Sequence, residues 1–169
     1  MPVQVERRTF NVEEYHRMLD AGIITEDDRV ELIEGEILMM SPIGSWHAAC
    51  VNRLDALLHR LFGESVIISV QNPIRLSDFS EPQPDLAVLR ARQDYYAQTH
   101  PTSNDILLLI EVADQSLEFD RDVKVPLYAK AAIFGSRNRS CCAVSRSYGS
   151  SGTSRDLRRP LRIGDAKED

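Results

Sequence analysis

The sequence predicts a single α/β domain in which a central mixed β-sheet is flanked by helices, and three observations support this fold class. Residues 106–110 are five aliphatic residues without alternation, as in a strand buried on both faces of a sheet. Residues 46–62 repeat apolar side chains at the three- and four-residue spacing of a core-facing helix. A chain of 169 residues is long enough to bury one core and is typical of one domain.

The composition is that of an ordinary globular protein, with 43% hydrophobic and 27% charged residues. No apolar run approaches the roughly 20 residues needed to span a bilayer, and residues 1–14 lack the apolar segment of a signal peptide. We therefore expect a cytoplasmic protein without a membrane partner. The three cysteines, Cys50 and the adjacent Cys141 and Cys142, make neither a disulfide framework nor a zinc ligand set.

Charge is distributed unevenly along the chain. Residues 1–133 carry 12 basic and 22 acidic side chains, whereas residues 134–169 carry 8 basic and 4 acidic ones. An acidic body argues against nucleic-acid binding over the whole surface. It is compatible with a local site at which metal ions offset the carboxylates.

The N-terminal third predicts a short helix and then a hairpin. Asn11 can cap a helix over residues 12–21 that Gly22 ends. Residues 29–40 have the pattern of two short strands joined by a tight turn at Glu34-Gly35.

The helix predicted over residues 46–62 ends at Gly63 and has one apolar stripe. The stripe consists of His47, Cys50, Val51, Leu54, Leu58 and Leu61. A histidine in such a stripe is more often a hydrogen-bonded core residue than a functional one, and both interpretations of His47 stay open.

The second half of the chain predicts strands at residues 66–71, 74–76, 84–89 and 106–112. A helix is expected over residues 120–132, starting late so that Pro126 falls in its first turn. Residues 134–169 are rich in Ser, Arg and Gly without periodicity, so they are expected to be a largely disordered tail beyond a domain of residues 1–133.

Glu111 follows the aliphatic run directly and is the residue that most suggests a functional site. A carboxylate at the end of a buried strand is costly to desolvate unless a cation or a donor meets it. Lys124 and a divalent metal are the candidate cations, with Asp85 as a second carboxylate and Glu34 as a third acidic ligand. A metal shared by these groups would polarise a phosphodiester and lower the pKa of a bound water, and Lys124 could orient that water.

Two other interpretations of these charges remain. Lys124 could form a solvated helix pair with Asp120, four residues earlier. Paired carboxylates could also act as acid and base on a sugar, although the aromatic content gives no sign of a sugar platform.

Four motifs in order resemble the Uma-two family of restriction endonucleases in the PD-(D/E)XK superfamily. They are Glu31-Leu-Ile-Glu-Gly-Glu36 with a later Met-Ser-Pro and His47, Glu81-Pro-Gln-Pro-Asp85-Leu-Ala-Val, Ile110-Glu-Val-Ala-Asp-Gln-Ser, and Asp120-Arg-Asp-Val-Lys124-Val-Pro-Leu-Tyr128-Ala. The resemblance runs from about residue 9 to residue 133. It implies a restriction-endonuclease-like core that hydrolyses DNA with Mg²⁺ or Mn²⁺.

Residue by residue, the resemblance implies that Asp85 and Glu111 bind the metal and that Lys124 is the superfamily's lysine, moved onto the following helix. Ala113 occupies the usual lysine position, two residues after Glu111. Glu34 matches the family's early acidic position and would be catalytic. His47, Gln71 and Tyr128 match positions that line the site. DNA is the expected partner, and a second copy of the chain is a further candidate.

The chain departs from the family pattern after Ile133. Relatives continue with Gly-Ile-Pro and a further strand, where this chain has Phe134-Gly-Ser-Arg-Asn-Arg139 and no such strand is expected. Some codon choices for these six residues, read one nucleotide later, encode Ser-Glu-Val-Gly-Ile-Val. We hypothesise a change of reading frame near Ile133, which keeps open the alternative of a truncated, inactive protein that binds metal or nucleic acid without turnover.

Overall fold

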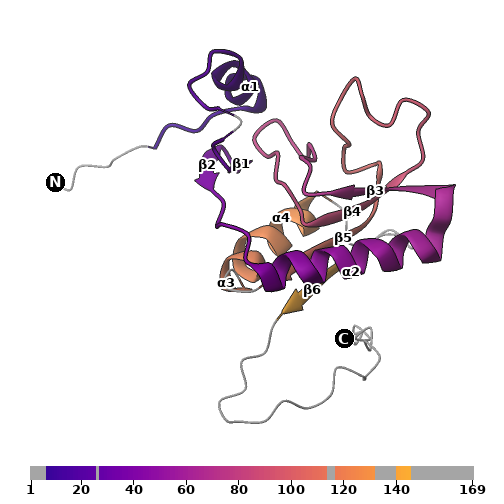
Figure 1. Cartoon of the computed structure of the whole chain (residues 1–169). Helices are drawn as coiled ribbons and strands as arrows, with labels where there is room; N and C mark the ends of the chain where they lie inside the picture. Colours follow the sequence, from indigo (N-terminus) through magenta and orange to yellow (C-terminus); the bar gives the residue numbers. More distant parts are fainter. Residues whose placement is uncertain (1–6, 26, 114–116, 132–139, 146–169) are drawn as a thin grey trace, which may run out of the picture.

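The computed structural model describes residues 7–25, 27–113, 117–131 and 140–145. Its centre is a four-stranded sheet in the order β3 (Val66–Val70), β4 (Leu86–Arg90), β5 (Ile106–Ala113) and β6 (Ser140–Ser145). The β3–β4 and β4–β5 pairs are antiparallel, while β6 runs parallel to β5. The predicted α/β class with a central mixed sheet flanked by helices is therefore confirmed, and Figure 1 shows the arrangement.

The two faces of the sheet have separate cores, because successive side chains of a strand point to opposite faces. One face packs against α2 (Ser45–Phe62) through Leu86, Val88, Ile110 and Val112. The other face carries Ala87, Leu89 and Leu109, which cluster with Tyr128 of α4 (Val125–Lys130). A register shift opposite Val88 and Leu89 interrupts this alternation, so Ile106 joins the α4 side while Leu107 packs on the α2 side.

The predicted N-terminal helix and hairpin are both present. Helix α1 (Val12–Asp20) begins with a capping box between Asn11 and Glu14, and the hairpin consists of β1 (Val30–Ile33) and β2 (Glu36–Met39). Glu34 and Gly35 form the turn with φ angles of 49° and 84°. A Cβ on Gly35 would lie 2.5 Å from the Thr9 Cβ, so only glycine fits this turn.

The helix predicted over residues 120–132 is a composite. A short α3 (Leu117–Phe119) leads into a π-helical segment, η2 (Asp120–Lys124), and α4 follows with Pro126 in its first turn. Pro126 has no N–H to donate to the preceding turn. One residue earlier, the Val125 N–H bonds the Asp120 carbonyl, which closes the wider π turn. The expected late helix start is present, and a π turn precedes it.

Two sequence expectations are corrected by the structure. Residues 74–76 form no strand, because Ile74 and Leu76 bond within their own loop, to the carbonyls of Pro82 and Ser80; the apolar character of Ile74 reflects complete burial. Leu61 is 65% exposed, so the stripe of α2 ends before its last turn. The strand predicted over residues 106–112 is present as β5, with Glu111 two residues before its end.

The tail also contains a strand that the sequence did not predict. Strand β6 lies within the predicted tail and pairs along β5 from Leu108 to Ala113. The free edge of a buried strand offers a row of unpaired N–H and C=O groups to any extended segment. The remainder of the predicted tail, including the proposed frame change at 134–139, lies outside the described residues. None of the described helices is long and apolar enough to cross a membrane.

Candidate active site

Asp85 and Glu111 meet between β4 and β5. Leu86 pairs with Ile110 in the strand register, so Asp85 and Glu111 are the next positions along the same ladder. The Asp85 N–H donates to Glu111 Oε2 at 3.3 Å, and the Val112 N–H donates to Asp85 Oδ2 at 2.8 Å. Both carboxylates are therefore held against the backbone of the neighbouring strand, which fixes their orientation.

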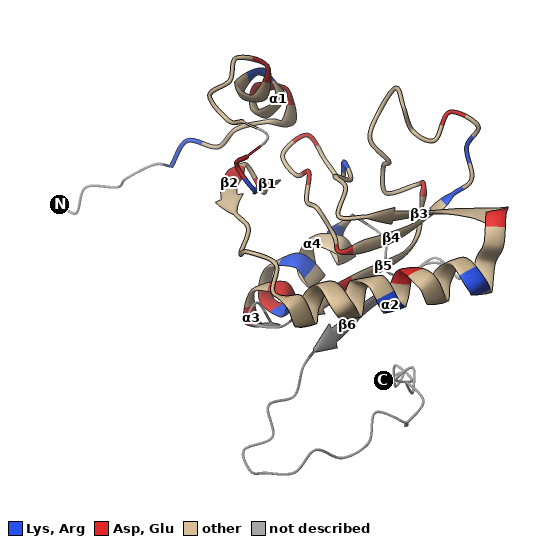
Figure 2. Ribbon diagram, in the orientation of Figure 1, with Lys and Arg blue, Asp and Glu red and all other residues tan. Residues whose placement is uncertain are grey.

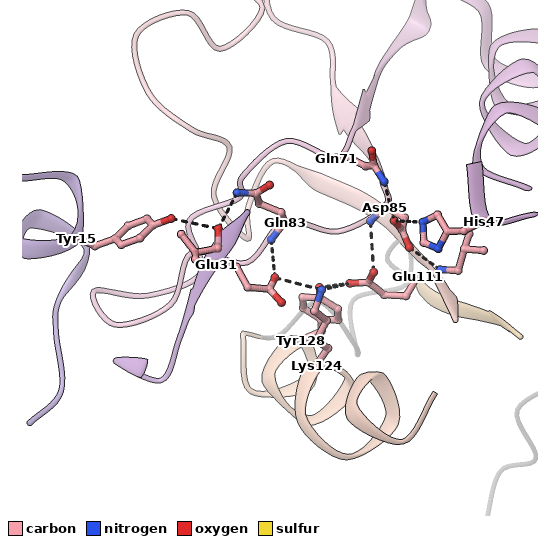
Figure 3. A network of polar contacts seen from close by, with 11 residues as sticks. Tyr15, Glu31, His47, Gln71, Gln83, Asp85, Glu111, Lys124 and Tyr128 are labelled. Carbon is pink, nitrogen blue, oxygen red and sulfur yellow. Dashed lines mark hydrogen bonds and ion pairs between the residues drawn. The ribbon is translucent and has the colours of Figure 1, made fainter. Parts of the chain in front are cut away.

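The segment after β5 brings a lysine and a tyrosine against Glu111. The Lys124 ammonium lies 3.5 Å from Glu111 Oε1, and the Tyr128 hydroxyl donates to the same oxygen. Lys124 and Tyr128 are four residues apart at the π-to-α junction, so their side chains point in one direction toward the sheet. Figure 3 shows both groups beside Glu111.

A third carboxylate, Glu31, completes this cluster from the hairpin. The Lys124 Nζ lies 3.2 Å from Glu31 Oε2, and the Gln83 N–H donates to the same oxygen at 3.0 Å. Glu31 is 3% exposed and lies on β1, where all four residues are buried. Lys124 thus bridges two carboxylates from different parts of the chain, as Figure 3 shows.

Burial dominates the electrostatics of this cluster. Desolvation raises the pKa of Glu111 to about 7, although Lys124 and the Tyr128 hydrogen bond oppose it; Asp85 and Asp120 raise it further. Burial lowers the pKa of Lys124, but Glu111 and Glu31 outweigh that effect and the net shift is upward. Lys124 is therefore charged at neutral pH, while burial favours the neutral form of Glu111.

Two further side chains orient Asp85 from the other side. The His47 Nε2 lies 2.7 Å from Asp85 Oδ1, and the Gln71 amide donates to the same oxygen at 3.2 Å. Gln71 has a φ angle of 51°, a strained conformation for a residue with a side chain, and its N–H donates to the Asp85 carbonyl at 3.1 Å. His47 therefore contacts the cluster, which favours the functional interpretation of this residue.

Among the residues predicted for the site, the structure brings together Asp85, Glu111, Lys124, His47, Gln71 and Tyr128. Glu34 is not with them. Its carboxylate pairs with Lys130, both side chains are more than half exposed, and the two line a separate cavity of about 440 Å³. The turn that contains Glu34 points its side chain outward, whereas Glu31 lies three residues earlier on a buried strand.

Sequence reasoning missed Glu31, although a signal for it was present. The stretch Val30-Glu-Leu-Ile33 contains a carboxylate inside an apolar strand, the same conflict that identified Glu111. The acidic residue predicted from this hairpin was instead Glu34, which lies in the turn. A charged residue within an apolar strand is a stronger indicator of a buried site than one in a turn.

The donor set suits a hard divalent cation. Glu31 and Glu111 share one lysine, and Asp85 lies against Glu111. Burial raises the pKa of Glu111, with smaller upward contributions from Asp85 and Asp120. Carboxylate oxygens are the ligands that Mg²⁺ and Mn²⁺ prefer. Asp85 is more accessible than Glu111, with a side chain 13% exposed against 3%.

Comparison with known proteins gives a family match. No curated protein matches the chain. A family model described as "Putative restriction endonuclease", that of the Uma2 family, matches residues 12–133, well over half of the 169 residues. The matched range includes every residue of the cluster, and the chain belongs to the Uma2 family.

Proposed function

We propose that this protein is a metal-dependent endonuclease that hydrolyses phosphodiester bonds of DNA. The observation that carries the proposal is the meeting of Asp85, immediately before β4, with Glu111 of β5, and the position of Lys124 against Glu111. The family description supports the reaction class. In this proposal, Asp85 and Glu111 hold Mg²⁺ or Mn²⁺, and DNA is the partner.

Each side chain has a role that follows from its contacts. A bound divalent ion would polarise the phosphodiester and make a water acidic enough to attack near neutral pH. Lys124 would orient that water or stabilise charge on the phosphate, because its ammonium is held beside Glu111 by a second carboxylate. Tyr128 holds Glu111, while His47 and Gln71 hold Asp85.

The charge distribution favours a local contact with DNA. Figure 2 shows Lys and Arg residues spread over several elements among acidic residues. Salt-dependent binding to many phosphates needs a concentrated basic surface. Affinity for DNA should therefore depend strongly on the metal that Asp85 and Glu111 would hold.

Cleavage of supercoiled plasmid by the full chain tests the proposal. Nicking should require Mg²⁺ or Mn²⁺, stop with a chelator, and fall by at least about 100-fold in Asp85→Asn and Glu111→Gln. Glu118→Gln, which changes an exposed acid on α3, should nick at the wild-type rate. Nicking that persists in a chelator or in Asp85→Asn would overturn the assignment.

The acidic body also favours a second candidate, a nuclease-fold protein that binds metal without turnover. It predicts that Mn²⁺ raises the melting temperature by mass action while no plasmid is nicked. Measuring melting and nicking on the same preparations separates the two functions. A metal-dependent shift that disappears in Asp85→Asn, without any cleavage by the wild type, would select the second candidate.

A further inference from the structure

A second group of potential ligands surrounds Glu81, outside the cluster described above. Glu81 is 3% exposed, and its backbone pairs with Leu32 of β1. One carboxylate oxygen, Oε1, lies 2.7 Å from His16 Nε2, while the other, Oε2, is buried without a hydrogen-bond partner. A buried carboxylate oxygen without a partner is costly and is a common sign of a bound water or ion.

Two imidazoles converge on this carboxylate from distant segments. His16 lies on α1, Glu81 lies in the loop before β4, and His100 lies in the loop between β4 and β5. One ligand atom from each of the three side chains lies within 4.8 Å of the other two, and the imidazole centroids are 6.0 Å apart. Among the described residues, this is the group of three metal-ligand side chains that meets such a distance limit.

The three side chains open onto a cavity of about 600 Å³. Arg75 also lines this cavity, and its guanidinium bonds Asp78 at 3.1 Å. His16 and His100 are accessible to solvent, so an ion could reach them without unfolding of the core. Glu81, in contrast, is held rigidly by the strand bridge.

We propose that His16, Glu81 and His100 form a second metal site that takes a transition-metal ion of the Zn²⁺ type. Two imidazole nitrogens and one carboxylate are a ligand set that suits Zn²⁺ and leaves a fourth position for water or another ligand. That fourth position would face the cavity. The ion would also compensate the unpartnered oxygen of Glu81.

The two sites differ in ligand chemistry. The Asp85 and Glu111 site presents strand carboxylates, which suit Mg²⁺ and Mn²⁺, whereas imidazole ligands favour Zn²⁺ over Mg²⁺. Millimolar Mg²⁺ should therefore leave the second site free for Zn²⁺. A bound ion would join α1 and both loops to one centre and so stabilise the folded chain.

The test uses the full chain with Asp85→Asn and Glu111→Gln, so that the first site cannot contribute. Competition with a chromophoric chelator should show one Zn²⁺ bound per chain in excess Mg²⁺. Adding His100→Ala should weaken that binding by more than about 100-fold, because loss of a ligand costs more than loss of a supporting residue. Adding His59→Ala instead should leave it unchanged, since the His59 ring contacts Asp55 within α2.

His100 is exposed on a loop, so its truncation should not prevent folding. The otherwise wild-type chain provides a second measurement: Zn²⁺ should raise its melting temperature, and His100→Ala should lose most of that rise while melting normally without metal. Equal Zn²⁺ affinity with and without His100, or no Zn²⁺ bound when Asp85 and Glu111 are replaced, would refute the second site. Neither measurement uses DNA cleavage, so failure here is distinct from failure of the proposed endonuclease.

Discussion

Lys124 Nζ lies 3.2 Å from Glu31 Oε2, and this ion pair joins the N-terminal hairpin to the segment that follows the central strand. Both side chains are almost fully buried, at 7% and 4% exposure. The pair is not a surface salt bridge of negligible value, because removal of either partner leaves a charge in the protein interior.

Replacing Lys124 by methionine should destabilise the fold and abolish cleavage. Glu31 and Glu111 would lose their shared cation, and breaking a buried ion pair from one side costs about 3–5 kcal/mol. Urea unfolding measures this loss. Lys130→Met is the matched control, since Lys130 pairs with Glu34 at the surface and should change the free energy of unfolding by less than about 1 kcal/mol. In the double variant Lys124→Met with Glu111→Gln, part of the lost stability should return.

The stability of the metal-free protein should depend on pH through Glu111. Its pKa is raised from 4.5 to about 7 in the folded state, so between these values the folded protein holds a proton that the unfolded chain has released. The stabilisation that this proton gives is fully present below pH 4.5. It falls as the pH rises from 4.5 to 7 and is lost above 7, so the free energy of unfolding should decrease by about 3 kcal/mol in total. Unfolding in a chelator from pH 4.5 to 8 should show this fall in the wild type, relative to Glu111→Gln. Parallel curves for the two proteins would contradict the assignment.

Glu31→Gln should impair cleavage more than Glu34→Gln. Glu31 positions Lys124 from a buried strand, whereas Glu34 bonds Lys130 at an exposed turn. We expect a loss of about 10-fold or more for Glu31→Gln, chiefly in kcat, because a displaced Lys124 weakens charge stabilisation at the reacting phosphate. Plasmid nicking measured at several DNA concentrations checks both variants. A greater loss of cleavage for Glu34→Gln would contradict this expectation and support the catalytic role that the family resemblance implies for Glu34.

A proline at Ala143 should disrupt the outer edge of the sheet. Ala143 pairs with Glu111 in the parallel β5–β6 ladder, and proline cannot donate a ladder hydrogen bond. Exposure of the β5 edge should lower the melting temperature and promote edge-to-edge association. Thermal melting and light scattering measure the two effects. Unchanged melting would show that β6 contributes nothing to the sheet.

Gly35→Ala should destabilise the hairpin by about 1–3 kcal/mol. The added methyl group would meet the Thr9 side chain at 2.5 Å, in a backbone conformation with φ of 84°. Gly22→Ala is the control, since Gly22 has a similar φ of 68° but open space around it. The difference in unfolding free energy between the two variants isolates the steric contact from the backbone strain.

Local patterns were enough to predict most of the elements. The Asn11 cap, the turn at Glu34-Gly35 and the apolar spacing of α2 each depend on residues a few positions apart. The aliphatic run of β5 required a sheet with helices on both faces. The structure contains these predicted features because the interactions that cause each of them act within one segment of the chain.

The need for a group that compensates Glu111 follows from the sequence, since an apolar strand leaves no water for its carboxylate. Which groups supply that compensation depends on how the elements pack. Strand register brings Asp85 beside Glu111, the π turn before Pro126 aims Lys124 at the sheet, and hairpin packing selects Glu31 over Glu34. The pairing of β6 with β5 was also decided at this level. Register, helix phase and packing relate residues far apart in the chain, and a local pattern carries no information about such relations.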